Sequence, residues 1–125
     1  MARFRPCQRL RTPAEFDRVF RRGVRLDGAL FVLVAAPNDG DCDRLGLAVS
    51  RRVGGAVARN RVRRLLRESF RRLERGARPS ADLVIVGKPE LANAGLEEVG
   101  RELNARVRRL ARAAGRGRAC PTRAR

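Results

Sequence analysis

RNRVRRLLRESFRR, residues 59–72, constrains the fold more than any other stretch, because it carries apolar residues at helical spacing. The stripe is made of Val62, Leu65, Leu66, Ser69, Phe70 and Leu73. Residues repeating every three or four positions line one side of a helix, and an apolar side is expected to face a core. The pattern predicts a helix over residues 60–75, with Asn60 as its N-cap and with Gly76 and Pro79 marking its end.

The other side of this predicted helix is cationic. Its members are Arg63, Arg64, Arg67, Arg71 and Arg75. Like charges three and four residues apart repel, and Glu68 is the only acid between residues 59 and 72. Guanidinium groups are planar, forked donors that match phosphate oxygens, so this side predicts binding to an external polyanion.

The composition of the whole chain points the same way. Thirty basic and 13 acidic residues give 125 residues a net charge of +17, and nucleic acid is the partner that such a charge favours. All basic residues except Lys88 are arginine, which reflects either selection for forked phosphate contacts or a codon preference. The length predicts one domain, residues 1–114, followed by a basic tail, residues 115–125, that is disordered until bound.

Several classes of protein are disfavoured. No apolar run approaches the ~18 residues that cross a bilayer, and the basic N-terminus lacks the apolar stretch of a secretory signal, so a cytoplasmic protein is expected. Cys7, Cys42 and Cys120 are far apart and are interpreted as free thiols. Because histidine is absent and no Cys pair has the spacing of metal ligands, a His-based triad and a built-in transition-metal centre are excluded.

Seven elements are expected along the chain. The first helix has Thr12 as N-cap, Pro13 at its first position and Glu15 in a capping box, and it closes at Gly23. Strands are predicted at residues 24–26, 30–36, 45–50 and 82–87, with a hairpin across the polar turn 37–43, and a last helix at residues 96–114. The order α-β-β-β-α-β-α predicts an α/β (α+β) two-layer sandwich with two helices on one face of a small sheet.

Some candidate site residues allow two interpretations. Phe16 and Phe20 share one face of the first helix, where they could pack in a core or stack on unpaired bases. Arg51 and Arg52 precede Val53-Gly54-Gly55 and could be solvated, or could flank a backbone-amide anion site at a helix N-terminus. Asn60 could act as a cap, as a phosphate contact, or as both.

The acidic residues are scattered, and no pair has the spacing of a general acid and base, so the residues alone indicate a binding protein. A basic ribosomal or ribosome-assembly protein would share the charge and the size. A helix-turn-helix DNA regulator would need a second helix directly before residue 60, where strands are predicted. A self-sufficient nuclease would need grouped carboxylates or histidines.

Residues 50–68, SRRVGGAVARNRVRRLLRE, resemble the signature of the bacterial ribonuclease P protein component, including its RNR motif at residues 59–61. The resemblance extends to residues 9–11, 15–20, 31–34, 45–50 and 82–89, in the expected order, and covers residues 7–112. The family often has an aromatic residue at the position of Val34 and asparagine at the position of Gly55.

This resemblance implies an α/β sandwich with a left-handed crossover, contrary to the usual right-handed rule. It also implies a small subunit of a ribonucleoprotein endonuclease that removes the 5′ leader of precursor tRNA. In that family the catalytic RNA and its Mg²⁺ ions perform the hydrolysis, so no catalytic or metal-binding residue is expected here. One protein would bind one ribonuclease P RNA, and neither a membrane nor DNA is expected as a partner.

The resemblance further implies two sets of site residues. The RNA-binding set is Arg9, Arg11, Arg51, Arg52, Arg59, Asn60, Arg61, Arg63, Arg64, Arg67 and Arg71. The set lining a cleft for the single-stranded leader is Phe16, Phe20, Phe31 and Val34.

Overall fold

The computed structural model describes residues 9–10, 12–38, 42–73 and 80–117. Its elements, in chain order, are α1 (Pro13–Arg22), β1 (Val24–Asp27), β2 (Phe31–Pro37), β3 (Arg44–Ala48), α2 (Ala56–Arg71), β4 (Ala81–Gly87), the 3-10 helix η2 (Pro89–Asn93) and α3 (Leu96–Gly117). The predicted element order and the α+β class are therefore confirmed, and η2 is an addition that the sequence reasoning missed.

The four strands form one mixed sheet in the order β1-β2-β4-β3. β2 pairs antiparallel with β1 and with β4, whereas β3 runs parallel to β4. The hairpin predicted across residues 37–43 is wrong, because β4 lies between β2 and β3. The apolar run of β4 can pair on both sides and bury both faces, which makes it the better central strand.

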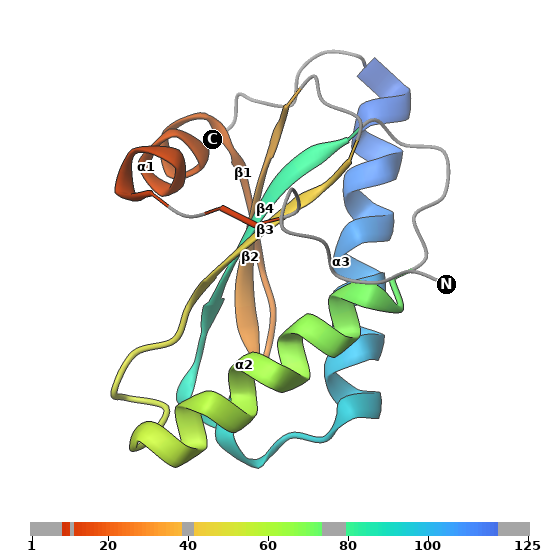
Figure 1. Ribbon diagram of the computed structural model, residues 1–125. Coiled ribbons are helices and arrows are strands. Elements are labelled where there is room, and N and C mark those ends of the chain that lie inside the picture. Colours follow the sequence, from red (N-terminus) through yellow and green to blue (C-terminus); the bar gives the residue numbers. More distant parts are fainter. Residues whose placement is uncertain (1–8, 11, 39–41, 74–79, 118–125) are drawn as a thin grey trace.

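The two faces of the sheet carry separate cores. Phe31, Leu33 and Ala35 of β2 pack with α2, η2 and α3. Val32, Val34 and Ala36 point the other way and pack with α1, because successive strand residues alternate between faces. Two helices share one face, as predicted, and α1 lies on the opposite face (Figure 1).

α1 begins as the sequence predicted. The Thr12 hydroxyl accepts a hydrogen bond from the Glu15 amide, and the Glu15 carboxylate accepts one from the Thr12 amide. This capping box fixes the first turn. Val19 is fully buried against the sheet, and Gly23 ends the helix by donating its amide to the Val19 carbonyl.

α2 begins four residues earlier than predicted and ends at Arg71 rather than Arg75. Gly55 is its N-cap, so the assignment of that role to Asn60 is wrong; Asn60 lies one turn inside the helix. The cap has no side-chain hydrogen bond, which explains why the start is hard to read from the sequence. The predicted apolar stripe is confirmed, since Val62, Leu66 and Phe70 are buried.

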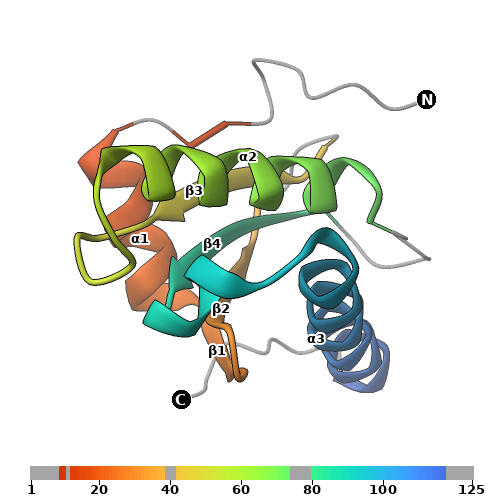
Figure 2. The same cartoon turned by 90° about the horizontal axis from the view of Figure 1, so that it is seen from below.

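α3 packs beside α2 on the same face of the sheet (Figure 2). It continues to Gly117, so residues 115–117 are helical rather than part of the predicted disordered tail, and residues 118–125 lie outside the described residues. Cys42 is a free thiol, whereas Cys7, Cys120, Arg11, Arg75, Gly76 and Pro79 lie outside the described residues. No helix in the described part of the chain is long and apolar enough to cross a membrane.

Candidate nucleic-acid interface

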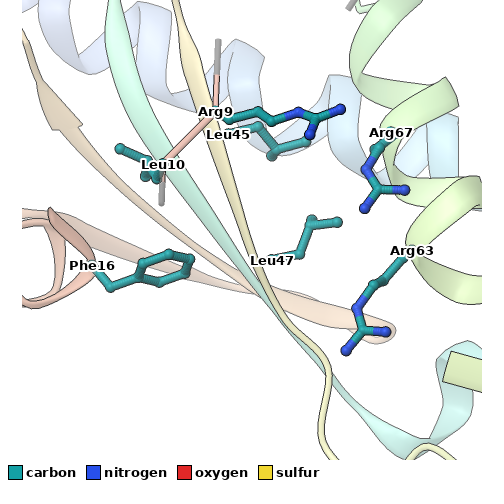
Figure 3. Close-up of a pocket in the computed structure, with 7 residues that line it drawn as sticks. All are labelled: Arg9, Leu10, Phe16, Leu45, Leu47, Arg63 and Arg67. Atoms are coloured by element: carbon teal, nitrogen blue, oxygen red, sulfur yellow. The ribbon is translucent and has the colours of Figure 1, made fainter. Parts of the chain in front are cut away.

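A pocket lies between α1 and α2, at the edge of the sheet formed by β3 (Figure 3). We call it the arginine pocket; its volume is about 240 Å³, and it is lined by Arg9, Leu10, Phe16, Leu45, Leu47, Arg63 and Arg67. Residues 9 and 10 reach it because this segment runs parallel to β3, where the Leu10 amide donates to the Leu45 carbonyl at 2.9 Å. The pocket therefore joins segments that are far apart in the sequence.

Phe16 forms the α1 side of the arginine pocket, where its half-buried ring points toward β3 (Figure 3). The ring lies close to Gly46, since a Cβ at that position would come within 2.7 Å of the Phe16 Cζ atom. A side chain larger than hydrogen at position 46 would push the ring outward. Gly46 thus lets the Phe16 ring lie directly over β3.

The α2 side of the pocket is cationic. Arg63 and Arg67 are half-buried and extend from α2 toward the sheet, and none of the seven lining residues is acidic. Burial lowers the pKa of Arg67, and the nearby charges of Arg9, Arg63 and Arg64 lower it further. These guanidinium groups therefore repel one another in the free protein, and an anion in the pocket would relieve that repulsion.

Other arginines of the predicted RNA-binding set are held by the protein itself. Arg61 donates to the carbonyls of Ala92 and Ala94, both at 3.0 Å, which ties α2 to the end of η2. Arg59 donates to the Gly54 carbonyl at 3.2 Å, and Arg71 pairs with Glu68, which also accepts a hydrogen bond from Arg72. The sequence reasoning placed these groups on an RNA-facing surface, but the structure shows that they also have internal partners.

Arg51, Arg52 and Arg64 are exposed. Arg51 and Arg52 lie in the turn before α2, where Gly54 adopts a φ of 150° that other residues rarely reach. The first turn of α2 contains no acid that would neutralise its free amides. Exposed Asn60 accepts a hydrogen bond from Arg63 at 3.2 Å, so it orients a pocket arginine.

The four residues predicted to line a leader cleft do not all come together: Phe16 and Val34 belong to the cluster on the α1 face, but Phe31 does not. Phe31 is fully buried on the α2 and α3 face, which is the wrong face for a cleft beside α1. Val34 lies on the α1 face but is only 2% exposed, and Phe16 lines the arginine pocket. Phe20 alone is well exposed, at 45%. The spacing of three between residues 31 and 34 could have revealed their opposite orientations.

The part of the sheet that α1 leaves partly uncovered was missed by the sequence reasoning. Ala48 pairs with Val86, and Val86 pairs with Val32, so these three residues share the α1 face. Ala48 and Val86 are half-buried there. We call Ala48, Val86 and Phe20, the exposed aromatic residue of α1, the apolar strip.

A second group missed by the sequence reasoning is an ion-pair network at the other end of β3 and β4. Arg44 donates through Nε and Nη2 to both oxygens of Asp82, each at 2.8 Å, and through Nη1 to Glu15 at 3.3 Å. Asn38 donates to the same Asp82 carboxylate at 2.9 Å. The Asp82 pair raises the pKa of Arg44. Because Glu15 also caps α1, this network joins α1 to the sheet.

The described residues contain no group of three or more His, Cys, Asp or Glu side chains that could hold a metal ion. The acids nearest to basic groups are engaged: Asp82 and Glu15 with Arg44, Glu68 with Arg71 and Arg72, and Asp27 with Lys88 at 3.0 Å. The Lys88 hydrogen bond lowers the pKa of Asp27. This donor set does not fit a protein-held magnesium ion, which needs uncommitted carboxylates or carbonyls.

Comparison with known proteins gives consistent matches. A family model described as Ribonuclease P matches residues 4–116. The ribonuclease P protein component of Roseiflexus castenholzii is 42% identical to this chain, in a match that covers 86% of this chain and 85% of that protein. The ribonuclease P protein component of Shouchella clausii is also 42% identical, and its match covers 74% of this chain and 76% of that protein. The structure of the ribonuclease P protein from Thermotoga maritima is 33% identical, with a TM-score of 0.69 over 80% of this chain and 96% of that one.

Proposed function

This chain belongs to the ribonuclease P protein family, and from that premise we propose how its surface serves the RNA-containing enzyme. It is the RNA-binding protein subunit of ribonuclease P, an endoribonuclease of tRNA processing, and its partner is ribonuclease P RNA. Family membership favours this function over the ribosomal alternative. The observation that carries the proposal is the arginine surface of α2, which lacks enough acids of its own to neutralise it.

We propose that the exposed arginines at the start of α2 and along its outer side bind ribonuclease P RNA. Arg51, Arg52 and Arg64 are exposed, and the structure gives their charges no acidic partner among the described residues. Contacts of this kind go to phosphates and position an RNA without reading its sequence. The protein would then accept many precursors with different sequences.

We propose that the single-stranded 5′ leader of precursor tRNA lies on the apolar strip of Phe20, Ala48 and Val86. Phe20 is an exposed aromatic residue on the helix that packs on this face of the sheet, and such a ring suits the stacking of unpaired bases. Phe20→Ala should raise KM for a precursor with a long leader and leave KM for a precursor with a one-nucleotide leader unchanged. Equal increases for both substrates would reject a leader contact at Phe20.

Magnesium does not fit the carboxylates described above, so we assign the Mg²⁺ of the ribonuclease P reaction to the RNA subunit and the precursor. The protein's own contribution is electrostatic: its arginines reduce the repulsion between the phosphates of the two RNAs. A cytoplasmic location and a ratio of one protein per RNA remain predictions.

The decisive test is cleavage of precursor tRNA by a ribonuclease P RNA at low Mg²⁺ and near-physiological salt, with and without this protein. Cleavage at the mature 5′ end only when both are present is the expected result. Tight RNA binding without stimulation would instead favour a ribosome-assembly protein. Cleavage by the protein alone would contradict a purely supporting role.

A further inference from the structure

A second pocket lies between α2 and α3, which pack side by side on one face of the sheet (Figure 2). We call it the interhelical pocket; its volume is about 360 Å³, and its lining includes Ser69, Arg72, Leu96, Glu97, Gly100 and Arg101. It shares no lining residue with the arginine pocket. None of the exposed arginines that we assign to ribonuclease P RNA lines it, so it is a separate site.

Ser69 is a polar residue within the apolar stripe of α2. It is 3% exposed, and its hydroxyl has no hydrogen-bond partner among the described residues. A buried hydroxyl without a partner lowers stability, so alanine would suit a purely structural position better. Because a serine side chain has three staggered rotamers, rotation about χ1 can present the hydroxyl to a ligand in the pocket. A ligand therefore explains the serine better than packing does.

Gly100 is a second lining residue that costs stability. It lies inside α3, where glycine is less favourable than alanine. A Cβ at this position would meet no neighbouring atom within 4 Å, so no close approach requires the glycine. The missing side chain leaves room in the pocket. Two destabilising residues on neighbouring helices thus border the same cavity, as expected where function is favoured over stability.

The charged residues of the pocket indicate the class of ligand. Arg101 is exposed and takes part in no ion pair among the described residues, whereas Arg72 shares the Glu68 carboxylate with Arg71. Guanidinium groups are forked donors that match the oxygens of a phosphate. Glu97 is also exposed, and its carboxylate suits a ligand that donates hydrogen bonds, as sugar hydroxyls do.

The size of the pocket agrees with this chemistry. Its volume is at the lower end of the ~300 to 1,000 Å³ of pockets that hold small molecules. Half-buried Leu96 adds an apolar surface for a ring. A molecule that combines a phosphate, sugar hydroxyls and one flat base is a nucleoside monophosphate.

We propose that the interhelical pocket binds one free nucleoside monophosphate. Arg72 and Arg101 hold its phosphate, Glu97 accepts hydrogen bonds from its ribose hydroxyls, and Ser69 contributes one hydrogen bond. This site goes beyond the proposed function, because its residues are separate from the arginines assigned to ribonuclease P RNA.

The first measurement is calorimetric titration of the full-length protein with AMP, GMP, CMP and UMP at near-physiological salt. At least one of them should bind one per protein, more tightly than inorganic phosphate and than its own nucleoside. Its 2′,3′-dideoxy analogue should bind more weakly, and Glu97→Ala should remove that difference. Equal affinity for inorganic phosphate would mean an adventitious ion only, and no binding at millimolar nucleotide would also overturn the proposal.

Ser69→Ala and Gly100→Ala distinguish a binding site from imperfect packing. Both should keep or raise the melting temperature, because the first removes an unpaired hydroxyl and the second favours the helix. Ser69→Ala should weaken nucleotide binding about 2- to 12-fold, the loss of one hydrogen bond. Gly100→Ala should weaken it by placing a methyl group in the pocket. Unchanged nucleotide affinity in both variants would overturn the proposal.

Arg101→Ala tests the phosphate contact, with Arg108→Ala as its matched control. Arg108 is an exposed arginine of the same helix that does not line the pocket, so both substitutions remove one charge. Arg101→Ala should weaken nucleotide binding about tenfold, the loss of one charged hydrogen bond, and Arg108→Ala should retain the affinity. Equal losses would show that the nucleotide responds only to net charge, which overturns the site.

The end of an RNA chain carries the same chemical groups, so the source of the nucleotide needs its own arm. The nucleotide that binds is titrated into the complex of the protein with ribonuclease P RNA, where its affinity should be unchanged. Loss of binding in the complex would assign the pocket to the RNA and overturn a free nucleotide as its occupant. If no nucleotide binds while the protein still stimulates precursor cleavage, the pocket proposal is wrong and the proposed function stands.

Discussion

Arg44 and Arg67 are the same kind of residue in opposite settings. Arg44 is 27% exposed and pairs with both oxygens of Asp82, which is 4% exposed, and with Glu15. Arg67 is half-buried beside other arginines in a pocket without acids. The pKa of Arg44 is raised by its carboxylate partner, whereas that of Arg67 is lowered by burial and like charges. The first arginine holds the fold together, and the second is available to an anion from outside.

Removing Arg44 should produce the largest loss of stability. Arg44→Met leaves the Asp82 carboxylate buried without its cation, and breaking such a pair costs about 3 kcal/mol or more of unfolding free energy. Denaturant unfolding measures this loss. Arg21→Met is the matched control, because Arg21 and Asp17 form an exposed pair that contributes at most about 0.5 kcal/mol. Equal effects of the two substitutions would show that the Arg44 network does not stabilise the fold.

Arg61 tests whether an arginine of the RNR motif, like Arg44, stabilises the fold through internal partners. Arg61→Ala removes two hydrogen bonds to the carbonyls of Ala92 and Ala94, and it should cost about 1 kcal/mol of unfolding free energy. The salt dependence of RNA binding should stay close to that of the wild type, because these donors are already engaged. A slope reduced by a full unit with unchanged stability would instead place Arg61 on a phosphate.

Arg64 should show the reverse pattern. It is exposed on α2, so Arg64→Ala should change the unfolding free energy by less than about 0.5 kcal/mol. Binding to ribonuclease P RNA should weaken, and the slope of log affinity against log salt should fall by about one. Loss of stability without a change in this slope would show that Arg64 stabilises the fold and does not contact a phosphate.

The smallest effect is expected at the start of α2. Gly55 caps this helix without a side-chain hydrogen bond, its φ is −75°, and a Cβ there would meet no atom within 4 Å. Gly55→Asn should stabilise the protein by a few tenths of a kcal/mol, because an asparagine side chain can accept a hydrogen bond from a free amide of the first turn. Differential scanning calorimetry can measure the shift. A decrease in stability would show that the turn needs the freedom of glycine.

Local signals in the sequence were reliable where the partners are near in the chain. The capping box of Thr12 and Glu15, the apolar stripe of α2 and the central position implied by the β4 run were all readable, because their geometry depends on neighbouring residues. The start of α2 was not, because its cap is a glycine without a side-chain contact. The resemblance of residues 50–68 supplied the family, and the family model and the relatives confirmed it.

The candidate site could be predicted only in part. The sequence identified Arg63, Arg67 and Phe16 as functional residues but could not place them around one pocket, because α1, α2 and β3 meet only in the folded sheet. It also grouped Phe31 with Phe16 and Phe20, although strand alternation sends Phe31 to the opposite core. Ala48 and Val86 were missed because nothing local marks a strand residue as uncovered.

The sequence by itself determined the helical and strand periodicity, the excess of positive charge and the family, since each follows from residue type and short-range spacing. The tertiary structure decided the strand order and which arginines are neutralised. Arg44 meets Asp82 across 38 positions of the chain, and Arg61 meets Ala94 across 33. Ion pairing depends on distances of a few ångströms in space, and only the pairing of β3 with β4 and the packing of α2 beside η2 bring those groups that close.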